Sequence, residues 1–349
     1  HVYPGFIATN STLGLAEVDA VRATRDEDEI GDFLPHIRAA IAYDAESKII
    51  ESMRPNGVLV AQVTPRGGTI SGSSSIMQLD AWNWEDALIQ NDEGIHLNWP
   101  NPYSRGRWWL GEDPSLKINK NYSTNIKKVS TFFENAQVYS KNQIPVHLPY
   151  QAMSGVFEGN TTLYIHAKDE KQIVDGITYL KKIGLTKIVL VGGNGAVDQL
   201  DFLKENNIPV IVSRPHRLPD NEDDDPKAAF KIASQLVNSG LLVSIDVSGS
   251  MERMNTRNLP FYAGSFAAYG LDKEEALQLI TLNSAKILGI NDKLGSLEVG
   301  KHATLFLSKG DALDMRTNII EHAFISGREL SLETHQTELW KRYSKKFQK

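Results

Sequence analysis

The fold is decided by residues 162–193, which read TLYIHAKDEKQIVDGITYLKKIGLTKIVLVGG. The two ends of this stretch, TLYIHA (162–167) and KIVLVGG (187–193), are short apolar runs, which is typical of strands buried on both faces. Between them, apolar residues such as Ile173 and Ile177 recur three or four positions apart, as on one face of a helix. This order predicts parallel strands joined by a right-handed crossover.

The same alternation continues toward the C-terminus. Two more strands are predicted in PVIVSR (209–214) and LLVSIDV (241–247), with helices in residues 197–207 and 226–240. Strands that alternate with helices at this spacing predict an α/β fold built on parallel strands.

The N-terminal half has a less regular pattern. HVYPGFIATNS (1–11) predicts an opening strand, residues 56–79 a strand, a Gly/Ser-rich loop and another strand, and residues 125–142 a helix. Within 56–79, RGGTISGSSS (66–75) is expected to be a surface hairpin rather than a lid. Residues 94–115 are aromatic and are expected to form a loop.

The remaining segments after residue 215 predict a loop, a helix and several short strands. The acidic run 220–226 is expected to be a solvated loop, and residues 271–290 a helix that Asp272 caps. Residues 293–308 and 319–330 alternate like strands around glycine turns.

Length and composition limit the possible classes of protein. With 349 residues, 41% of them hydrophobic, the chain can form one large α/β barrel or two ordinary domains. A formal net charge of −6 argues against nucleic acid as the main partner, and no apolar run approaches the roughly 18 residues of a membrane span. The absence of cysteine excludes disulfides and thiolate metal sites. Because the sequence starts at His1, we expect export to the periplasm if a signal peptide precedes it, and a cytoplasmic protein otherwise.

Three passages carry a family resemblance: HVYPGFI (1–7), NLPFYAGSFAAYGLDKEEALQLITLNSAKILGI (258–290) and KLGSLEVGKHATLFLS (293–308). Together they resemble the amidohydrolase superfamily, in particular its imidazolonepropionase-related branch. The resemblance implies a distorted TIM (β/α)8 barrel over residues 1–292. It also implies strands of a small composite β-sandwich over 293–330 and a basic C-terminal helix or tail over 331–349.

The resemblance also implies a chemistry. Amidohydrolases use a metal-bound hydroxide to attack a carbon–nitrogen centre, while an aspartate moves the proton. Their usual ligands are a His-x-His pair after strand 1, a Lys or Glu on a middle strand, a histidine after strands 5 and 6, and an aspartate after strand 8. All of these lie at the carboxyl ends of the strands.

Most of these positions are altered in this sequence. The strand 1 pair falls on Asn10 and Thr12, neither of which is a good zinc ligand, and Ala8 stands at the preceding aspartate position. Strand 5 keeps a histidine, His166, whereas strand 6 ends at Val191 or Gly192, and no middle-strand Lys or Glu can be identified.

The remaining candidates lie at the ends of strands 7 and 8. Family spacing places the aspartate near Ser248, and Asp246, two residues earlier, faces the same side of the strand. His216 lies at the predicted rim of strand 7. We therefore predict His166 and Asp246 as metal ligands and Asp246 and His216 as an acid–base pair, if the three side chains converge at the barrel mouth.

Each candidate also has a structural interpretation. The histidines could be hydrogen-bonded core or rim residues, as could His96 in GIHLNWP, and Asp246 could cap the turn that follows it. The cofactor is accordingly one divalent metal, zinc or similar, or none.

Two functions follow from the resemblance. The first is a hydrolase of carbon–nitrogen bonds other than peptide bonds, with a reduced or rebuilt metal site and a small-molecule substrate at the barrel mouth. The second is a catalytically inactive relative that serves as a binding or subunit-forming module, as a homo-oligomer or beside a paralogous amidohydrolase.

Overall fold

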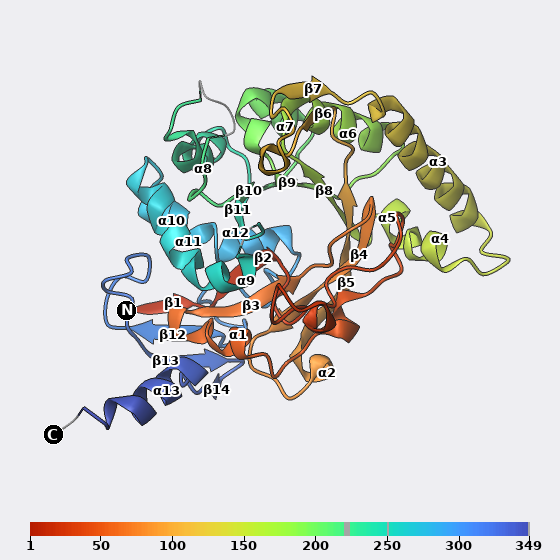
Figure 1. Ribbon diagram of the computed structural model, residues 1–349. Helices are drawn as coiled ribbons and strands as arrows, with labels where there is room; N and C mark the ends of the chain where they lie inside the picture. Colours follow the sequence, from red (N-terminus) through yellow and green to blue (C-terminus); the bar gives the residue numbers. More distant parts are fainter. Residues whose placement is uncertain (220–223, 250, 348–349) are drawn as a thin grey trace.

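A computed structural model describes residues 1–219, 224–249 and 251–347 (Figure 1). Its centre is a closed barrel of eight strands in the order β2-β3-β4-β5-β8-β9-β10-β11. These strands are β2 (Phe6–Ser11), β3 (Val58–Val63), β4 (Ile70–Gln78), β5 (Leu88–Asn98), β8 (Thr162–Ala167), β9 (Ile188–Gly192), β10 (Val210–Ser213) and β11 (Val243–Asp246). The predicted α/β barrel is therefore confirmed, and β8 to β11 are its fifth to eighth strands, as expected.

One strand of the barrel runs against the others. β4 pairs antiparallel with both β3 and β5, whereas the other neighbouring pairs are parallel. This reversal lets the short connection 64–69 join β3 to β4 without a crossover helix. It also distorts the barrel from the regular eightfold repeat.

Two sequence expectations were wrong in this half of the chain. Residues 66–75 are not a surface hairpin, because β4 occupies 70–78 and is almost entirely buried. Similarly, β5 extends to Asn98 within the segment that was expected to form a loop. Glycine and serine in β4 and charged residues in β5 hid the apolar pattern by which buried strands are recognised.

Most of the helices surround the barrel, whereas the C-terminal helix α13 (His335–Ser344) lies apart from it (Figure 1). The other helices are α1 (Lys48–Glu51), α2 (Trp84–Ala87), α3 (Tyr122–Lys141), α4 (Leu148–Ala152), α5 (Ser154–Phe157), α6 (Glu170–Lys182), α7 (Leu200–Glu205), α8 (Ala228–Asn238), α9 (Glu252–Asn255), α10 (Leu259–Ala268), α11 (Lys273–Gln278) and α12 (Leu282–Ile287). Short 3-10 turns occupy Arg22–Thr24, Ala39–Ala42, Arg54–Asn56, Trp108–Leu110, Asn194–Gln199 and Thr256–Asn258. None of the helices in the described part of the chain is both long enough and apolar enough to cross a membrane.

Helix α6 shows how the sequence builds this layer. Asp169 and Gln172 form a capping box at its start, and Ile173, Ile177 and Leu180 bury its inner face. Gly176 lies on the same face, where an added Cβ would approach Cδ1 of Ile165 on β8 to 2.4 Å. The helix therefore packs closely on β8 only because residue 176 has no side chain.

The predicted helix 271–290 is interrupted. It forms α11 and α12, separated by Leu279–Thr281, and Asp272 caps α11 as expected by accepting hydrogen bonds from the backbone of residues 274 and 275. Residues of and after α12 pack into an apolar cluster with side chains from the barrel interior. The cluster comprises Ile7, Val60, Ile76, Tyr164, Val189, Val191, Ile211, Ala285, Ile287, Leu288, Ile290 and Leu294. This cluster fills one end of the barrel, where Ser244 of β11 also bonds to Ser284 of α12 at 2.7 Å.

A small sheet beside the barrel joins the two ends of the chain. Its order is β1-β12-β13-β14, with β1 (Val2–Pro4), β12 (Leu305–Ser308), β13 (Ile320–Ile325) and β14 (Arg328–Glu329). The C-terminal strands were expected here, and β1 adds an N-terminal strand antiparallel to β12. A separate hairpin, β6 (Tyr103–Arg105) with β7 (Leu116–Ile118), lies in a barrel connection.

Two predicted segments fall partly on residues that the structure leaves undescribed. Of the acidic run, residues 220–223 lie outside the described part. At the C-terminus, α13 forms within the predicted basic tail, and residues 348–349 lie outside the description.

Candidate functional site

The candidate site lies at the carboxyl ends of the barrel strands, where Asp246 ends β11. Val243 and Ile245 belong to the outer apolar cluster, so the alternate residue Asp246 faces the barrel interior. Asp246 accepts hydrogen bonds from Nδ2 of Asn10 at 2.8 Å and from the backbone N and the hydroxyl of Ser248 at 2.8 and 2.9 Å. Burial raises the pKa of Asp246, and these hydrogen bonds oppose the rise. Asp246 therefore faces inward and also caps its turn, which were the two interpretations left open by the sequence.

Asn10, at the first ligand position of strand 1, connects Asp246 to an arginine. Its backbone is left-handed, with φ of 50°, at an irregularity in the pairing of β2 with β3. Its Oδ1 accepts from Nη1 of Arg66 at 2.9 Å, and its backbone carbonyl accepts from Nη2 at 2.8 Å. The Arg66 guanidinium is thus fixed over the end of β2 by two hydrogen bonds to one residue.

Thr12, at the second ligand position, makes an equivalent connection. Its backbone N and hydroxyl donate to Oε1 of Glu252 at 2.6 and 2.8 Å, and its hydroxyl oxygen accepts from Nη1 of Arg253 at 3.0 Å. Both carboxylate oxygens of Glu252 lie 3.2 Å from Nη2 of Arg66. The two altered positions of strand 1 therefore converge on one ion pair, Arg66–Glu252.

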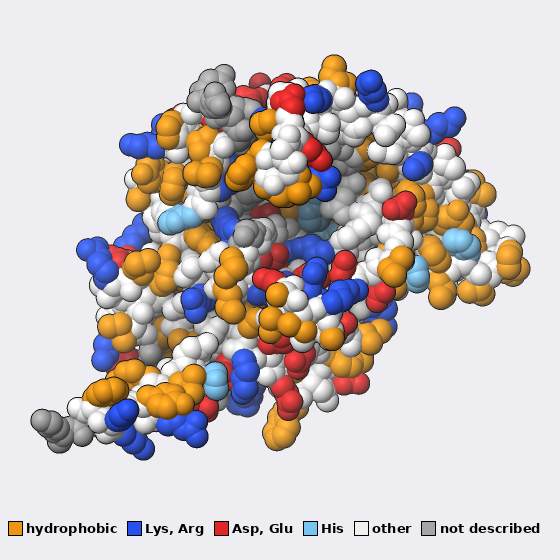
Figure 2. Space-filling view, viewed as in Figure 1, with side chains coloured by type: hydrophobic (Ala, Val, Ile, Leu, Met, Phe, Trp, Pro, Cys, Tyr) orange, Lys and Arg blue, Asp and Glu red, His pale blue; other side chains and the backbone are white. Residues whose placement is uncertain are grey.

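The outer part of this cluster is also charge-paired. Arg253 contacts Glu27 at 2.7 Å and forms an ion pair with Asp19. A cavity of about 440 Å³ is bordered by Arg66, Glu252, Arg253, Glu27 and Asp19, among others. Figure 2 shows a hollow over the middle of the barrel in which basic, acidic and histidine side chains lie together.

His166, the retained strand 5 histidine, pairs with another histidine. Its Nε2 lies 2.9 Å from Nδ1 of His96 on the neighbouring strand β5, and Nε2 of His96 lies 2.9 Å from Oγ of Ser74. His96 is fully buried, whereas His166 keeps part of its surface exposed. Burial lowers the pKa of His166 to about 3 and that of His96 well below its ordinary value, so both rings are neutral.

A buried carboxyl, Glu93, ends this chain of hydrogen bonds. It accepts from Ser74 at 2.5 Å, from Nε2 of Gln62 at 2.7 Å and from the hydroxyl of Tyr164 at 2.8 Å. Oε1 of Gln62 accepts from the backbone N of Asn10 at 2.9 Å, which joins this chain to the Asp246 cluster. Burial raises the pKa of Glu93 to about 7.

These hydrogen bonds fix the ring tautomers when Glu93 is ionised. Ser74 donates its proton to Glu93, so its oxygen accepts from Nε2 of His96. Nδ1 of His96 is then unprotonated and accepts from Nε2 of His166. It follows that His166 carries its proton on Nε2 and an unprotonated Nδ1.

His216 does not join this site, contrary to the prediction. Its ring bonds to the hydroxyl of Ser265 at 2.8 Å and packs against Phe230 and Tyr262, which belong to α8 and α10 outside the barrel. The chain bends at residues 215–217 after β10 ends, and His216 lies against the helical layer.

Comparisons with known proteins agree with this architecture. Residues 180–330 match the model described as "Amidohydrolase family". A solved amidohydrolase from Thermotoga maritima superposes with a TM-score of 0.82 at 21% identity, over 95% of this chain and 87% of that one. The match to the family model and the shared fold support the resemblance to the amidohydrolase superfamily that the sequence predicted.

The proteins that this chain resembles include named deaminases. The chain is 24% identical over 336 residues to the 5-methylthioadenosine/S-adenosylhomocysteine deaminase of Thermoanaerobacter pseudethanolicus, covering 87% of this chain and 72% of the relative. It is 26% identical over 213 residues to the 5'-deoxyadenosine deaminase of Methanobrevibacter smithii, covering 52% of this chain and 48% of the relative. The matched segment thus spans only about half of the latter enzyme. A 79-residue segment is 37% identical to an imidazolonepropionase of Syntrophobacter fumaroxidans.

Amidohydrolases typically hold a divalent metal such as zinc, but the residues at the mouth of this barrel do not fit one. Asn10 and Thr12 replace the strand 1 histidines, and hydrogen bonds to charged partners occupy both side chains. Nowhere in the described residues do three histidine or acidic side chains lie so that they could hold a metal ion. His166 and Asp246, the two predicted metal ligands, therefore belong to no such group of three in the described part of the chain.

Sequence reasoning missed three charged residues of this site: Arg66, Glu93 and Glu252. Arg66 was assigned to a surface hairpin, Glu93 lies on a strand whose pattern was not recognised, and Glu252 lies beyond the last strand. One sequence feature could have pointed to Arg66: the loss of the His-x-His pair indicates that another cationic group takes the place of the metal.

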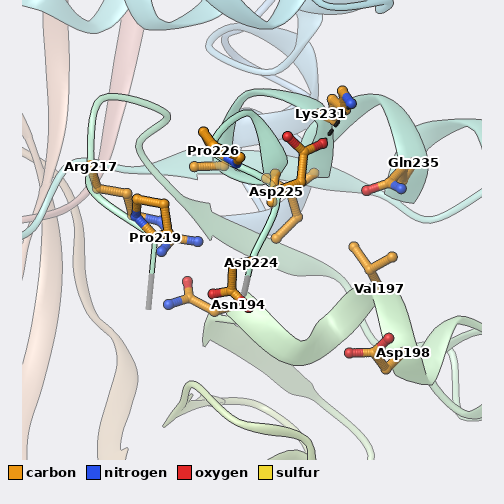
Figure 3. Close-up of a pocket in the computed structure, with 13 residues that line it drawn as sticks. Asn194, Val197, Asp198, Arg217, Pro219, Asp224, Asp225, Pro226, Lys231 and Gln235 are labelled. Carbon is orange, nitrogen blue, oxygen red and sulfur yellow. Dashed lines mark hydrogen bonds and ion pairs between the residues drawn. The ribbon is translucent and has the colours of Figure 1, made fainter. Parts of the chain in front are cut away.

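A second pocket lies outside the barrel, between residues 194–198 and helix α8 (Figure 3). Asp225 and Lys231 form a 2.7 Å ion pair at its edge. It contains none of the predicted site residues, so the barrel mouth remains the candidate site.

Proposed function

We propose that this chain hydrolyses a carbon–nitrogen bond, other than a peptide bond, in a small molecule bound at the barrel mouth. The observation that carries the proposal is the position of Asp246, which faces the barrel interior at the end of the eighth strand. In the amidohydrolase superfamily that strand end supplies the proton-transfer aspartate. The relatives cited above are named as enzymes, so the comparisons give no support to the alternative of an inactive module.

The reaction needs one proton-transfer group. Water adds to the carbon, its proton passes to Asp246, and the same proton is returned to the nitrogen as the carbon–nitrogen bond breaks. The raised pKa of Asp246 favours this double role, because a carboxyl group whose pKa lies nearer to neutral pH accepts and returns a proton more readily. The nearby guanidinium of Arg66 stabilises negative charge that develops on oxygen.

The names of the two deaminases suggest the first substrates to test. The purified chain is incubated with 5'-deoxyadenosine, 5-methylthioadenosine, S-adenosylhomocysteine and an imidazolone propionate, and ammonia release or ring opening is followed. We expect turnover of at least one compound. The variant Asp246→Asn should lower it by about 100-fold or more, because an amide cannot accept the proton.

A matched substitution controls for the loss of a carboxylate. Asp201 is exposed on α7, so Asp201→Asn should leave the rate unchanged. Wild-type turnover by Asp246→Asn would refute the role of that residue. Absence of turnover with every compound, in a folded protein, would count against hydrolysis of these classes.

A further inference from the structure

We infer that the Arg66–Glu252 ion pair takes the place of the divalent metal at the mouth of this barrel. The side chain of Glu252 is 8% exposed and that of Arg66 25% exposed, so the pair is largely shielded from water. Arg66 contacts Asn10 at the first ligand position of strand 1, and Glu252 contacts Thr12 at the second. The guanidinium therefore brings a positive charge to the place where the superfamily has its metal.

The replacements at the ligand positions suit this arrangement chemically. The amide of Asn10 donates to the carboxylate of Asp246 and accepts from the guanidinium of Arg66. The hydroxyl of Thr12 likewise donates to Glu252 and accepts from Arg253. Both residue types carry a donor and an acceptor, so each can bridge an acid to a base. These substitutions form a coherent network rather than a set of lost ligands.

Charge balance also disfavours a metal at this place. Glu252 is paired with Arg66, and Glu27 and Asp19 are paired with Arg253. A divalent cation beside Asn10 would lie against the fixed charge of Arg66, and two positive charges a few ångströms apart in a shielded site repel strongly. Binding would require Arg66 to leave Asn10 and Glu252, which would cost its hydrogen bonds.

The replacement of the metal by the ion pair does not depend on the proposed function, but what the ion pair does for a substrate rests on it. A guanidinium donates hydrogen bonds to a carbonyl or carboxylate oxygen of a substrate, but it does not bind and acidify water as a metal does. Activation of water would then fall to Asp246. Substrates that present an oxygen to Arg66 would be favoured over substrates that lack one.

The test measures metal binding by the wild-type chain and does not depend on whether the chain turns over a substrate. Metal content of the protein, purified without chelator, is measured by mass spectrometry. The melting temperature is recorded with added Zn²⁺ or Mn²⁺ and with EDTA. We expect far less than one metal per chain and no change in melting temperature. One tightly held metal per chain, or a clear rise in melting temperature with Zn²⁺, would overturn the inference.

Two variants sharpen the test. Arg66→Met removes the cation and leaves Asp246 and Glu252 uncompensated, so its melting temperature should fall by several degrees and recover in part with Zn²⁺. The control Arg54→Met breaks another arginine–carboxylate pair, Arg54–Asp80 at 2.6 Å, away from the mouth. It should lose stability without any response to Zn²⁺. An equal response in both variants would refute a specific role for Arg66.

If Arg66→Met does not fold, the wild-type measurements still decide the question. They also separate this inference from the proposed function. A protein without metal that releases no ammonia would contradict only the proposed function, whereas ammonia release that EDTA abolishes would contradict only the inference.

Discussion

Nδ2 of Asn10 donates a 2.8 Å hydrogen bond to Oδ1 of Asp246, and this bond joins the side chains of the first and eighth barrel strands. The backbone ladder between these strands is short, with Asp246 registered against Thr9 only. The closure of the barrel therefore relies here on side chains as well as on backbone pairing. Oδ1 of Asn10 meanwhile accepts from Arg66, so one amide satisfies two charged groups.

The first prediction concerns this amide. Removing it leaves buried Asp246 and Arg66 each short of a partner, which should cost about 1–3 kcal/mol in the free energy of unfolding. Because Asn10 has a positive φ, Asn10→Gly removes the hydrogen bonds without adding backbone strain, whereas Asn10→Ala adds that strain. Urea unfolding should rank the wild type above Asn10→Gly and Asn10→Gly above Asn10→Ala.

A control for this series is Asn160→Ala, at an exposed turn, which should stay within about 0.5 kcal/mol of the wild type. Wild-type stability of Asn10→Gly would show that the bridge contributes nothing.

The second prediction concerns the pH dependence set by Glu93. Its pKa is raised from 4.5 to about 7, so between these values the folded chain holds a proton that the unfolded chain has released. Stability from this group is therefore present at low pH and is lost as pH rises from about 4.5 to about 7, by up to about 3 kcal/mol. The groups facing Glu93 are Gln62, Ser74, Tyr164 and Asp92.

The variant Glu93→Gln cannot titrate, so the measurement is the stability difference between wild type and variant at pH 5 and pH 8. From pH 5 to pH 8 the free energy of unfolding of the wild type should fall relative to that of Glu93→Gln. The exposed Glu205→Gln serves as the control and should show no such shift. A pH-independent difference for Glu93→Gln would show that Glu93 is ionised throughout.

The third prediction concerns the neutral histidine pair. The pKa of His166 is lowered from 6.5 to about 3, so the unfolded chain binds protons in this range while the folded chain does not. The corresponding stability is present above pH 6.5 and is lost as pH falls toward 3. Between pH 7 and pH 4.5, the wild type should lose on the order of 2 kcal/mol more of its free energy of unfolding than His166→Gln loses. The partial exposure of the ring keeps this value below the full effect of the pKa shift.

Acid unfolding followed by circular dichroism measures this effect, and His302→Gln, at an exposed position, is the matched control. An acid midpoint that is the same in His166→Gln as in the wild type would contradict a neutral, desolvated pair.

The fourth prediction concerns His216, which the structure places against Ser265, Phe230 and Tyr262. His216→Ala should leave kcat/KM for ammonia release within about twofold, because the ring lies outside the barrel. A loss comparable to that of Asp246→Asn would place His216 in the reaction after all.

The alternation of strands and helices in residues 162–247 predicted parallel strands and their order along the chain, and the family resemblance added the closure into a barrel. Local periodicity carries the information on the strands, because parallel strands buried on both faces are apolar throughout. For the same reason the first part of β4 was assigned to a loop, and the part of β5 that begins at residue 94 was not predicted as a strand. Their interior-facing residues include Ser74 and His96, so they lack a continuous apolar run.

The sequence by itself determined the parallel strands of the second half and the position of His166 and Asp246 at strand ends, since these follow from residue identity and spacing. Its resemblance to a known family implied the barrel and the loss of the strand 1 histidine pair. Only the tertiary structure decided what replaces the missing ligands. Arg66 and Glu252 are 186 positions apart, and they meet because closing the barrel brings the loop after β3 to the helix after β11. Hydrogen-bond partners at such a separation depend on how the chain closes, and local pattern does not encode that.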